Sequence, residues 1–387
     1  ENFFTYVKKF SFTSSLLCIF LIKNNIMKKV KMIFVSSTLS MLMLSSCALK
    51  PLAYQPERTP AFEGTTQLND KLVSSDKIQL DGWFGPEDIL FDGFGNLYTG
   101  VHNEDFSDSR ILKIYPSGKI EEFYNSGSWV AGMHFDKEQN LIALSHKQGL
   151  ISINTMKEVK ILAAKDENRK PFLIPNGLDI ADNGMMYFSN TSEISSYTIK
   201  YGRKIIMEMK PLGGLYSYNP ETEEIKTLIE GTYFGNGVVI SKDQNYLLMV
   251  ETTKYRVIKY WLSGTKAGQT EIFIDNLPGF PNGISIREVG SYWLGFSTKR
   301  NEALDKIQSK KVLKKFIYSL PKFMQPKAET FGMIMNVSEE GEIIESLFDT
   351  NGKVLPEAGA VKEFNGHLYI GGDVLPYVGK YKLYTNK

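Results

Sequence analysis

Cysteine is almost absent from this sequence. Only Cys18 and Cys47 occur among 387 residues, and both precede the segment that we expect to fold. A body without cysteine forms no disulfide, so its stability must come from packing alone. Excess charge of one sign is also missing, because the formal net charge is +2, which gives no reason to expect a nucleic-acid partner. Residues 1–46 hold six lysines and one acid, so the body itself is slightly acidic.

Familiar catalytic motifs are missing as well. The sequence contains no Gly-x-Ser-x-Gly elbow, no P-loop and no Cys-x-x-Cys pair. None of its four histidines shows metal-ligand spacing with another; they are His102, His134, His146 and His367. Helical periodicity is nearly absent from the body. What is present is apolar: hydrophobic residues make up 42% and aromatic residues 12%, enough to bury a sizeable core.

The first methionine, Met27, begins a pattern that is typical of an export signal. Three lysines lie within residues 28–31, and an apolar run over residues 32–44 follows that is too short to favour a spanning helix. The run ends in the tetrapeptide LSSC at Cys47, which resembles a bacterial lipobox. We therefore predict a lipoprotein signal peptide at 27–46, a lipid on Cys47 and anchoring to the cell envelope. An ordinary secretory signal or an uncleaved anchor is the alternative.

The segments on either side of this signal differ in kind. Residues 1–26 contain no methionine and precede a complete signal, so we interpret them as a non-native upstream extension. Residues 47–70 carry scattered prolines and polar residues, and we expect a tether between lipid and domain. Ala48 stands where an aspartate would retain a lipoprotein in the inner membrane. By the general rule for lipoprotein sorting, this favours the outer membrane or the periplasmic face.

A two-strand pattern recurs six times in the rest of the chain. Each copy has a small-residue turn, an apolar-alternating strand, a polar turn with Gly or Asn, and a second apolar strand. The copies are residues 85–101, 131–145, 175–190, 235–251, 281–297 and 357–372. A further hairpin follows each copy, which gives four strands per repeat and a period of about 45 residues, the size of a propeller blade.

These repeats predict an all-β fold, a six-bladed β-propeller with four-stranded blades over residues 71–387. A β-sandwich is the alternative, but it does not explain six copies of one pattern. The strand at residues 77–80 would close the ring by completing the last blade beside residues 379–384.

Two insertions, at residues 191–211 and 299–329, interrupt the repeat. The second has apolar residues at helical spacing from Leu304 to Leu320, with five lysines among them. This predicts a short basic amphipathic helix. Such a helix forms a lid over the channel, or contacts a membrane surface, or caps the propeller with a solvated basic face.

One position of the repeat is polar in four blades. Each of these residues lies eleven positions before the same site on the next strand; they are Glu87, Asn176, Asn236 and Asn282. In a propeller the first strand of each blade lines the channel, so the four side chains should converge near the axis. One carboxylate and three amide oxygens suit a hard cation, Ca²⁺ before Mg²⁺. The alternative is that these are ordinary turn residues.

Several segments resemble the strictosidine-synthase-like family, which includes the adipocyte plasma-membrane-associated proteins. They are residues 250–253 (VETT), 256–264 (RVIKYWLSG), 276–282 (NLPGFPN) and 292–300 (YWLGFSTKR). More distant similarity extends to regucalcin, gluconolactonases and paraoxonases. The resemblance implies a six-bladed propeller. It also implies a catalytic calcium ion at the positions of Glu87, Asn176, Asn236 and Asn282, as in the hydrolytic members.

Three departures limit what the resemblance implies. Strictosidine synthase uses a glutamate where this chain has Gly359, which argues against alkaloid-forming condensation. The hydrolytic relatives usually have Asp at the position of Asn282, and an amide cannot act as a general base. Paraoxonases have a histidine pair in the second blade, whose first position is Ala131 here. His146 matches the second position, or it is an ordinary turn histidine.

The leading hypothesis is a calcium-dependent ester or lactone hydrolase of the arylesterase or gluconolactonase kind, anchored to the envelope. Its substrate is a small ester or lactone, and Glu251 and His146 are its candidate catalytic residues. The alternative is a non-catalytic envelope lipoprotein that binds a ligand or partner and holds calcium for structural reasons. Glu251 is then a structural partner rather than an acid of the site.

Overall fold

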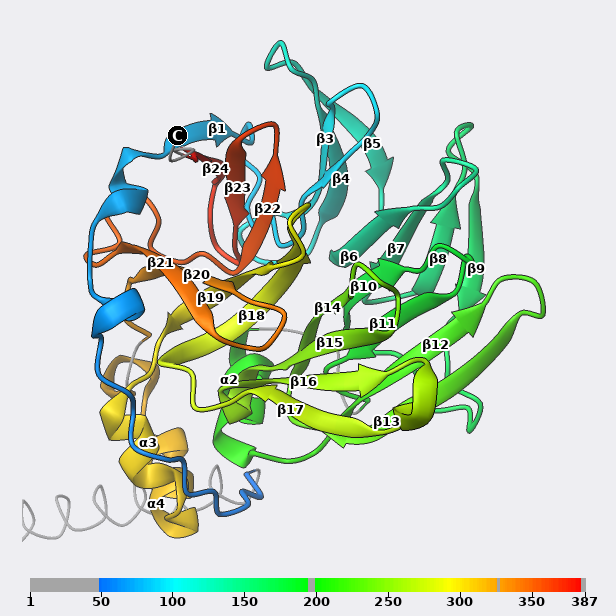
Figure 1. Cartoon of the computed structure of the whole chain (residues 1–387). Helices are drawn as coiled ribbons and strands as arrows, with labels where there is room; N and C mark the ends of the chain where they lie inside the picture. The colour runs from blue at the N-terminus through cyan, green and yellow to red at the C-terminus, as the bar shows by residue number, and fades with distance from the viewer. Residues whose placement is uncertain (1–48, 194–198, 326–327, 384–387) are drawn as a thin grey trace, which may run out of the picture. The chain divides into compact units, whose positions relative to one another are not determined.

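The computed structural model describes residues 49–193, 199–325 and 328–383 (Figure 1). The chain divides into two compact units. One unit comprises Leu52–Lys310 and Pro326–Lys387, and the other comprises Glu1–Pro51 and Lys311–Gln325. The predicted upstream extension (1–26), signal peptide (27–46) and lipidation site Cys47 all lie outside the described residues.

The larger unit is a ring of six four-stranded antiparallel sheets, which confirms the predicted β-propeller. Blade 1 contains β2 (Leu90–Phe91), β3 (Leu97–His102), β4 (Ser109–Ile114) and β5 (Ile120–Asn125). Blade 2 contains β6 (Val130–Phe135), β7 (Leu141–Ser145), β8 (Gly149–Ile153) and β9 (Val159–Ala163). Blade 3 contains β10 (Pro175–Ile180), β11 (Met186–Asn190), β12 (Gly213–Asn219) and β13 (Glu224–Thr232).

The other three blades repeat this order. Blade 4 contains β14 (Gly235–Ile240), β15 (Tyr246–Glu251), β16 (Arg256–Trp261) and β17 (Thr270–Ile274). Blade 5 contains β18 (Gly279–Ile286), β19 (Tyr292–Lys299), β20 (Gly332–Val337) and β21 (Ile343–Asp349). Blade 6 contains β22 (Ala360–Phe364), β23 (His367–Gly371) and β24 (Tyr377–Lys382), and its fourth strand is β1 (Asp76–Gln79).

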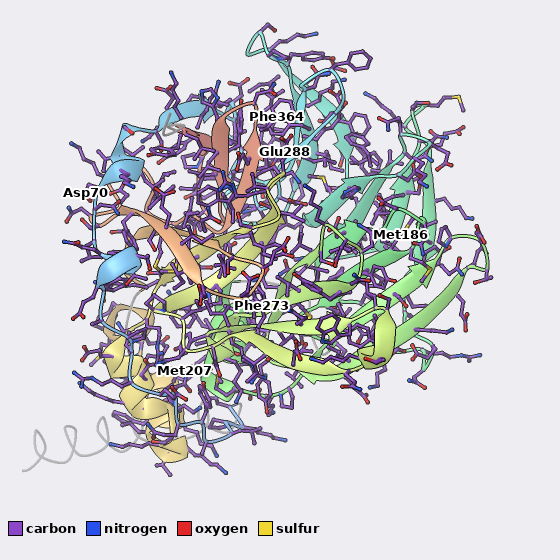
Figure 2. The ribbon with its side chains drawn as sticks, viewed as in Figure 1. Asp70, Met186, Met207, Phe273, Glu288 and Phe364 are labelled. Carbon is purple, nitrogen blue, oxygen red and sulfur yellow. The ribbon has the colours of Figure 1, made fainter. Side chains whose placement is uncertain are left out.

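The first strand of the propeller therefore completes the last blade. Lys77 pairs with Gly379 in the antiparallel β1–β24 ladder, as the sequence predicted. The junction between blades 6 and 1 is also closed by aromatic packing, because the ring of Phe364 stacks on Phe91 with centroids 4.0 Å apart (Figure 2). Both ends of the propeller are thus held in one sheet.

Apolar side chains fill the spaces between neighbouring blades. Phe273 of β17 meets Tyr292 of β19 edge to face, with ring centroids 5.8 Å apart (Figure 2). Leu248 and Leu294 are completely buried in the same cluster. Burial of each such side chain contributes roughly 1.5–3 kcal/mol, which meets the expectation that packing stabilises a body without disulfides.

The expected tether is partly ordered against the propeller. The side chain of Asn69 donates to the carbonyl of Ser346 at 3.0 Å and accepts from the amide of Phe348 at 3.2 Å. Phe62 packs edge to face on Phe348 with centroids 5.7 Å apart. This segment includes the short 3₁₀ helices η1 (Gly64–Thr66) and η2 (Lys71–Ser74). The segment packs along blade 5 because Phe62 is accommodated at an apolar site on that blade.

Both insertions are helical in part. The first contains α2 (Ile199–Glu208), and the second contains α3 (Glu302–Gln308), α4 (Lys311–Ser319) and the 3₁₀ helix η5 (Lys322–Met324). Two further 3₁₀ turns, η3 (Thr252–Lys254) and η4 (Gly264–Lys266), lie in blade 4. No helix in the described ranges is long and apolar enough to cross a membrane.

The continuous helix expected between Leu304 and Leu320 is divided into two. The carbonyl of Gln308 accepts a hydrogen bond from the amide of Tyr54 at 3.1 Å, so it does not continue the helical ladder. The amide of Lys310 instead bonds to Ile307 at 2.8 Å, which closes the last turn of α3 tightly. The end of α3 is therefore determined by Tyr54, a residue distant in sequence, and local periodicity does not predict it.

The smaller unit exposes apolar side chains on its helical part. In α4 the exposed fractions are 82% for Val312 and 52% for Phe316, and in η5 they are 82% for Phe323 and 55% for Met324. Lys314, by contrast, is completely buried. The arrangement differs from a helix that turns only its basic face to solvent.

Candidate metal centre in the central channel

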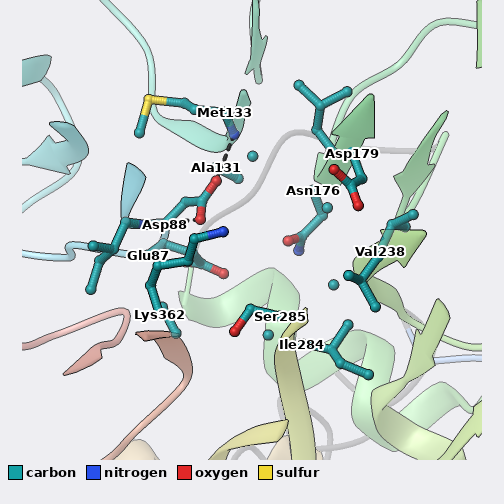
Figure 3. A pocket seen from close by; sticks show the side chains of 18 of the residues that line it. Glu87, Asp88, Ala131, Met133, Asn176, Asp179, Val238, Ile284, Ser285 and Lys362 are labelled. Atoms are coloured by element: carbon teal, nitrogen blue, oxygen red, sulfur yellow. Dashed lines mark hydrogen bonds between the residues drawn. The ribbon is translucent and has the colours of Figure 1, made fainter. Parts of the chain in front are cut away.

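The inner strands of the six blades surround a cavity of ≈ 140 Å³ (Figure 3). All four residues predicted to bind a metal line it; they are Glu87, Asn176, Asn236 and Asn282. Ala131, which occupies the equivalent place in blade 2, lines it too. Glu87 and Asn176 come from blades 1 and 3, and both line the cavity (Figure 3). Repeat-equivalent positions therefore meet at one place, although up to 195 residues separate them in the chain.

The three asparagines lie in β-bulges. The register between β10 and β11 shifts between Pro175 and Leu178, which leaves the dipeptide between them outside the regular ladder. The same shift occurs in blades 2, 4 and 5. The four displaced dipeptides are Asn176–Gly177, Asn236–Gly237, Asn282–Gly283 and Ala131–Gly132. A bulge bends the strand and redirects a side chain, so the repeated bulge turns this position toward the channel.

The glycine of each bulge lets the next blade approach. A Cβ atom on Gly177 would lie 2.4 Å from the backbone nitrogen of Val238. One on Gly237 would lie 2.7 Å from the backbone nitrogen of Ile284, and one on Gly132 would lie 2.4 Å from the carbonyl oxygen of Asn176. The backbone of each inner strand therefore packs directly against the bulge glycine of the neighbouring blade. This close packing keeps the asparagines of neighbouring blades near one another around the channel axis.

A hydroxyl group orients each asparagine amide. The Nδ2 atoms of the three residues donate to Thr191 Oγ1 at 3.3 Å, Thr252 Oγ1 at 3.2 Å and Ser297 Oγ at 2.9 Å, in chain order. Thr191 uses its own proton on the carbonyl of Gly235 at 2.6 Å, so it must accept from Asn176. That choice fixes which amide atom is nitrogen. Each amide turns its nitrogen to a hydroxyl and its oxygen away from it.

Glu87 supplies the carboxylate of the set. Its Oε2 is shielded from solvent and has no hydrogen-bond partner among the described residues. Burial raises the pKa of Glu87 well above its usual value, and the neighbouring charge of Asp373 and a hydrogen bond to it raise this pKa further. A buried carboxylate oxygen without a donor is costly. A cation beside Glu87 would remove that cost.

The residues present therefore fit a calcium ion. Glu87 and the three oriented amides offer only oxygen ligands, as Ca²⁺ and other hard cations require. The described residues contain no group of three or more His, Cys, Asp and Glu side chains arranged to hold a metal. The amide oxygens are consequently essential to the proposed ligand set.

Two further acids lie beside Glu87 and were not singled out from the sequence. Glu357 precedes β22, and Asp373 follows β23. Burial raises the pKa of Glu357 to about 8, and the charge of Asp373 adds to this effect. Ring closure brings them to Glu87, because the loop after the second strand of blade 6 lies on the same rim as the start of blade 1. Asp373 lies three residues after Ile370, as Thr191 lies three residues after Phe188, so a comparison of these loop positions between blades was the signal for it.

Acidic side chains further along the cavity wall connect neighbouring blades. Asp88 accepts from the amide of Met133 at 2.6 Å, and Asp179 accepts from the amide of Ile240 at 2.8 Å. Burial raises the pKa of Asp88 to about 6, although its backbone hydrogen bonds and the charge of Lys362 oppose this. Lys362 lines the same cavity (Figure 3). The wall is thus acidic with one cationic side chain among the described lining residues.

Glu251 does not join this group. It is 2% exposed, and its Oε1 accepts from the amide of Tyr233 at 2.8 Å. Its Oε2 accepts from Arg256 Nε at 2.6 Å and forms a salt bridge with that guanidinium group. Both oxygens are occupied, and Glu251 is not among the residues that line the cavity. The geometry is that of a structural partner.

His146 is buried beside the channel rather than exposed in a turn. Its ring meets Trp129 edge to face, with centroids 5.5 Å apart. Burial lowers its pKa to about 4, and a hydrogen bond to the carbonyl of Pro175 opposes this only in part. His146 is therefore neutral at pH 7. It is not among the cavity-lining residues, although Pro175 directly precedes Asn176.

Comparison with known proteins identifies the family. Models of strictosidine synthase and of the N-terminal part of strictosidine synthase-like proteins match residues 176–265 and 64–103. The Arabidopsis thaliana protein strictosidine synthase-like 13 is 32% identical over 314 residues, which cover 71% of this chain and 75% of that protein. The chain belongs to the strictosidine synthase-like family. The bovine adipocyte plasma membrane-associated protein is 28% identical, over 86% of this chain and 84% of that protein.

Solved structures agree on the fold. A gluconolactonase from Xanthomonas campestris superposes with a TM-score of 0.58 at 14% identity, over 87% of this chain and 97% of that one. A calcium-binding regucalcin from Agrobacterium tumefaciens gives 0.53 at 12% identity, over 78% and 90%. At these identities the likeness concerns the propeller alone.

Proposed function

We propose that this chain is a calcium-dependent hydrolase that acts on small esters or lactones. The observation that carries the proposal is the channel site itself. Three amides are oriented by hydroxyl groups around a carboxylate whose Oε2 has no hydrogen-bond partner among the described residues. The likeness to a gluconolactonase and a regucalcin supports the same assignment.

The residues of the site have distinct roles in this proposal. Glu87, Asn176, Asn236 and Asn282 would hold the ion. Bound there, Ca²⁺ would polarise a carbonyl oxygen and stabilise negative charge on it. Ala131 leaves the wall of blade 2 without a polar side chain, and so leaves room for substrate or water. Asp88, which lines the cavity next to Glu87, is the candidate acceptor for the proton of an attacking water molecule.

The size of the cavity limits the substrate. Its ≈ 140 Å³ is well below the roughly 300 Å³ at which sites for drug-sized ligands begin. The channel therefore admits a small ring or the acyl end of a longer ester. Aryl acetates and five- or six-membered lactones are the appropriate first substrates.

The proposal is tested by hydrolysis of phenyl acetate and a small lactone panel. The full chain, purified from membranes in detergent, is assayed with and without chelator, beside Glu87→Gln. The matched control is Glu122→Gln, an exposed acid of the same blade. We expect turnover in the wild type and the control, and its loss with chelator and in Glu87→Gln. Turnover that survives both treatments would overturn the metal mechanism.

A binding role is the second candidate, and specific observations favour it. Asn282 stands in place of a carboxylate, Glu251 is held by Arg256, and His146 is buried outside the cavity lining. In that case the ion stabilises the propeller, and the wild type turns over none of these substrates. Chelator and Glu87→Gln then lower the melting temperature and change nothing else.

We also propose that the protein works at a membrane surface, held by a lipid on Cys47. The apolar side chains exposed on α4 and η5, with Lys311 and Lys315 among them, support a contact with anionic lipid. Flotation of the full chain carrying Cys47→Ser tests this contact without the lipid. We expect binding to phosphatidylglycerol vesicles that is reduced by Phe316→Ser. If the Cys47→Ser chain floats equally with and without Phe316→Ser, the proposed membrane contact is wrong.

A further inference from the structure

Three carboxyl groups lie together where blade 6 closes on blade 1; they belong to Glu87, Glu357 and Asp373. Glu87 begins blade 1, while Glu357 and Asp373 flank the first two strands of blade 6. We propose that Asp373, supported by Glu357, is a positioning residue for the cation site. In this role it aligns Glu87 and supplies the negative charge that Asn282 lacks. The inference rests on the cation site of the proposed function and concerns how strongly that site binds.

The repeat itself indicates this role. Phe188, Leu294 and Ile370 occupy the same register opposite the inner strand in blades 3, 5 and 6. Three residues beyond them stand Thr191, Ser297 and Asp373, respectively. Thr191 and Ser297 hold the ligand amides of Asn176 and Asn282. Asp373 therefore occupies the place from which a side chain orients a ligand.

The loop that carries Asp373 is fixed by both blades. The carbonyl of Asp373 lies 2.9 Å from Nε2 of His102, and the amide of Gly85 donates to the carbonyl of Leu375 at 3.0 Å. On the other side, Glu357 Oε1 accepts from the amide of Val374 at 2.6 Å. The position of Asp373 is thus determined from blade 1 and from blade 6 together.

The loop that carries Asp373 also packs closely on the side chain of Glu357. A Cβ atom on Gly372 would lie 2.6 Å from the Cδ and Oε1 atoms of Glu357, so a side chain at this position would displace the carboxyl group. Glu357 is 9% exposed. Its carboxyl group therefore lies beneath the loop and beside Asp373.

The charge balance of this corner points to a cation. Neither Glu87 nor Glu357 forms a salt bridge with any described residue. The Oε2 atom of Glu87 also has no donor among them. Buried acids are normally paired or bind metal ions. Asp373 and Glu357 add two carboxyl groups beside Glu87, and a bound cation would favour the ionised form of each of them.

The ligand set stays that of the channel. No three acidic, histidine or cysteine side chains in the described parts of the chain are placed to hold an ion by themselves. Asp373 and Glu357 therefore act through Glu87 and through their charge. Residues that support the ligands of a metal in this way typically change its affinity by about 10- to 100-fold.

Calorimetric titration of Ca²⁺ into the metal-free full chain tests the inference. We expect Asp373→Asn to weaken binding at least tenfold and Glu357→Gln to weaken it less. Asp166→Asn is the matched control, because Asp166 is buried and accepts from the backbone amides of Asn168 and Lys170 but does not line the cavity. It should change the affinity by less than threefold. Circular dichroism checks that each variant is folded.

A charge-relocation variant separates this role from a merely structural one. If Asp373 supplies the charge that position 282 lacks, Asn282→Asp should restore the affinity of the Asp373→Asn chain. Wild-type affinity in Asp373→Asn, or no recovery in the double variant, would overturn the inference. The proposed hydrolase would survive either result. Conversely, a wild type that binds Ca²⁺ but hydrolyses nothing would leave the inference standing and remove the hydrolase.

Discussion

The hydroxyl group of Thr191 accepts a hydrogen bond from Nδ2 of Asn176 at 3.3 Å and donates one to the carbonyl of Gly235 in blade 4 at 2.6 Å. One small side chain thus fixes the orientation of a ligand and joins two blades. The second bond determines the first, because a hydroxyl group has a single proton to give. A ligand orientation in this channel is therefore coupled to the packing of neighbouring sheets.

Thr191→Val removes this coupling without a large change of volume. We expect a loss of about 1–3 kcal/mol of unfolding free energy, because the buried amide and the carbonyl of Gly235 lose their partner. Ca²⁺ affinity should fall severalfold. Thr227→Val, which removes an exposed bond to Glu167, is the control and should cost much less. Urea unfolding and calorimetry measure both effects, and equal losses in the two variants would contradict the assigned role.

Gly177→Ala should destabilise the propeller. Its new methyl group would lie 2.4 Å from the backbone of Val238, so the next blade has to move. We expect a cost of about 1–3 kcal/mol or more, as for other overpacked sites. Ca²⁺ binding should weaken with it. In Gly93→Ala the added methyl group meets nothing within 4 Å, and thermal unfolding should show little change.

Glu357→Gln should make stability less dependent on pH. Burial raises the pKa of Glu357 to about 8 in the fold, against the ordinary glutamate value of 4.5 in the unfolded chain. Between these values the unfolded chain is ionised while the folded one keeps its proton. Stability therefore falls as the pH rises through this window. The Gln variant lacks this contribution.

Urea unfolding at pH 5 and pH 8, with chelator present, measures the difference. The wild type should lose more unfolding free energy over this range than Glu357→Gln does. Removing Glu357 also removes its effect on the pKa of Glu87, so the comparison reports on these neighbouring carboxyl groups together. Parallel losses would show that burial does not hold the proton on Glu357.

Lys362→Met should strengthen cation binding. The ammonium group of Lys362 shares the cavity with the acids, and its charge acts on Asp88. Removing a positive charge from a partly enclosed site lowers the repulsion that an arriving cation meets. We expect a higher Ca²⁺ affinity in calorimetry, most clearly at low ionic strength. Lys160→Met, on the exposed surface, should leave the affinity unchanged.

The sequence predicts the propeller because each blade repeats one local pattern. The same repeat predicts which residues reach the axis, since Glu87 and Asn282 occupy one position of it. It does not show what each residue touches after the ring closes. Glu251 looks free in the sequence but pairs with Arg256 five residues later. Asp373 meets Glu87 only because the last blade lies beside the first.

The insertions show a different limit. Apolar periodicity indicated one helix from Leu304 onward, and it was right about helical structure. The break after Gln308 depends on Tyr54, which lies in a segment expected to be a loose tether. Short-range patterns report which face of an element is apolar. They do not predict which distant backbone amide will donate a hydrogen bond to the last carbonyl of a helix.

The pairing of β1 with β24 has a consequence for synthesis. The ribosome delivers Lys77 long before Gly379, so the sixth sheet stays incomplete until almost the whole chain has emerged. Contacts between such distant segments form late and slowly. A nascent chain in this state cannot yet close its ring of blades. A frameshift near the C-terminus would leave the N-terminal strand without a neighbour, and quality-control proteases would meet an exposed edge.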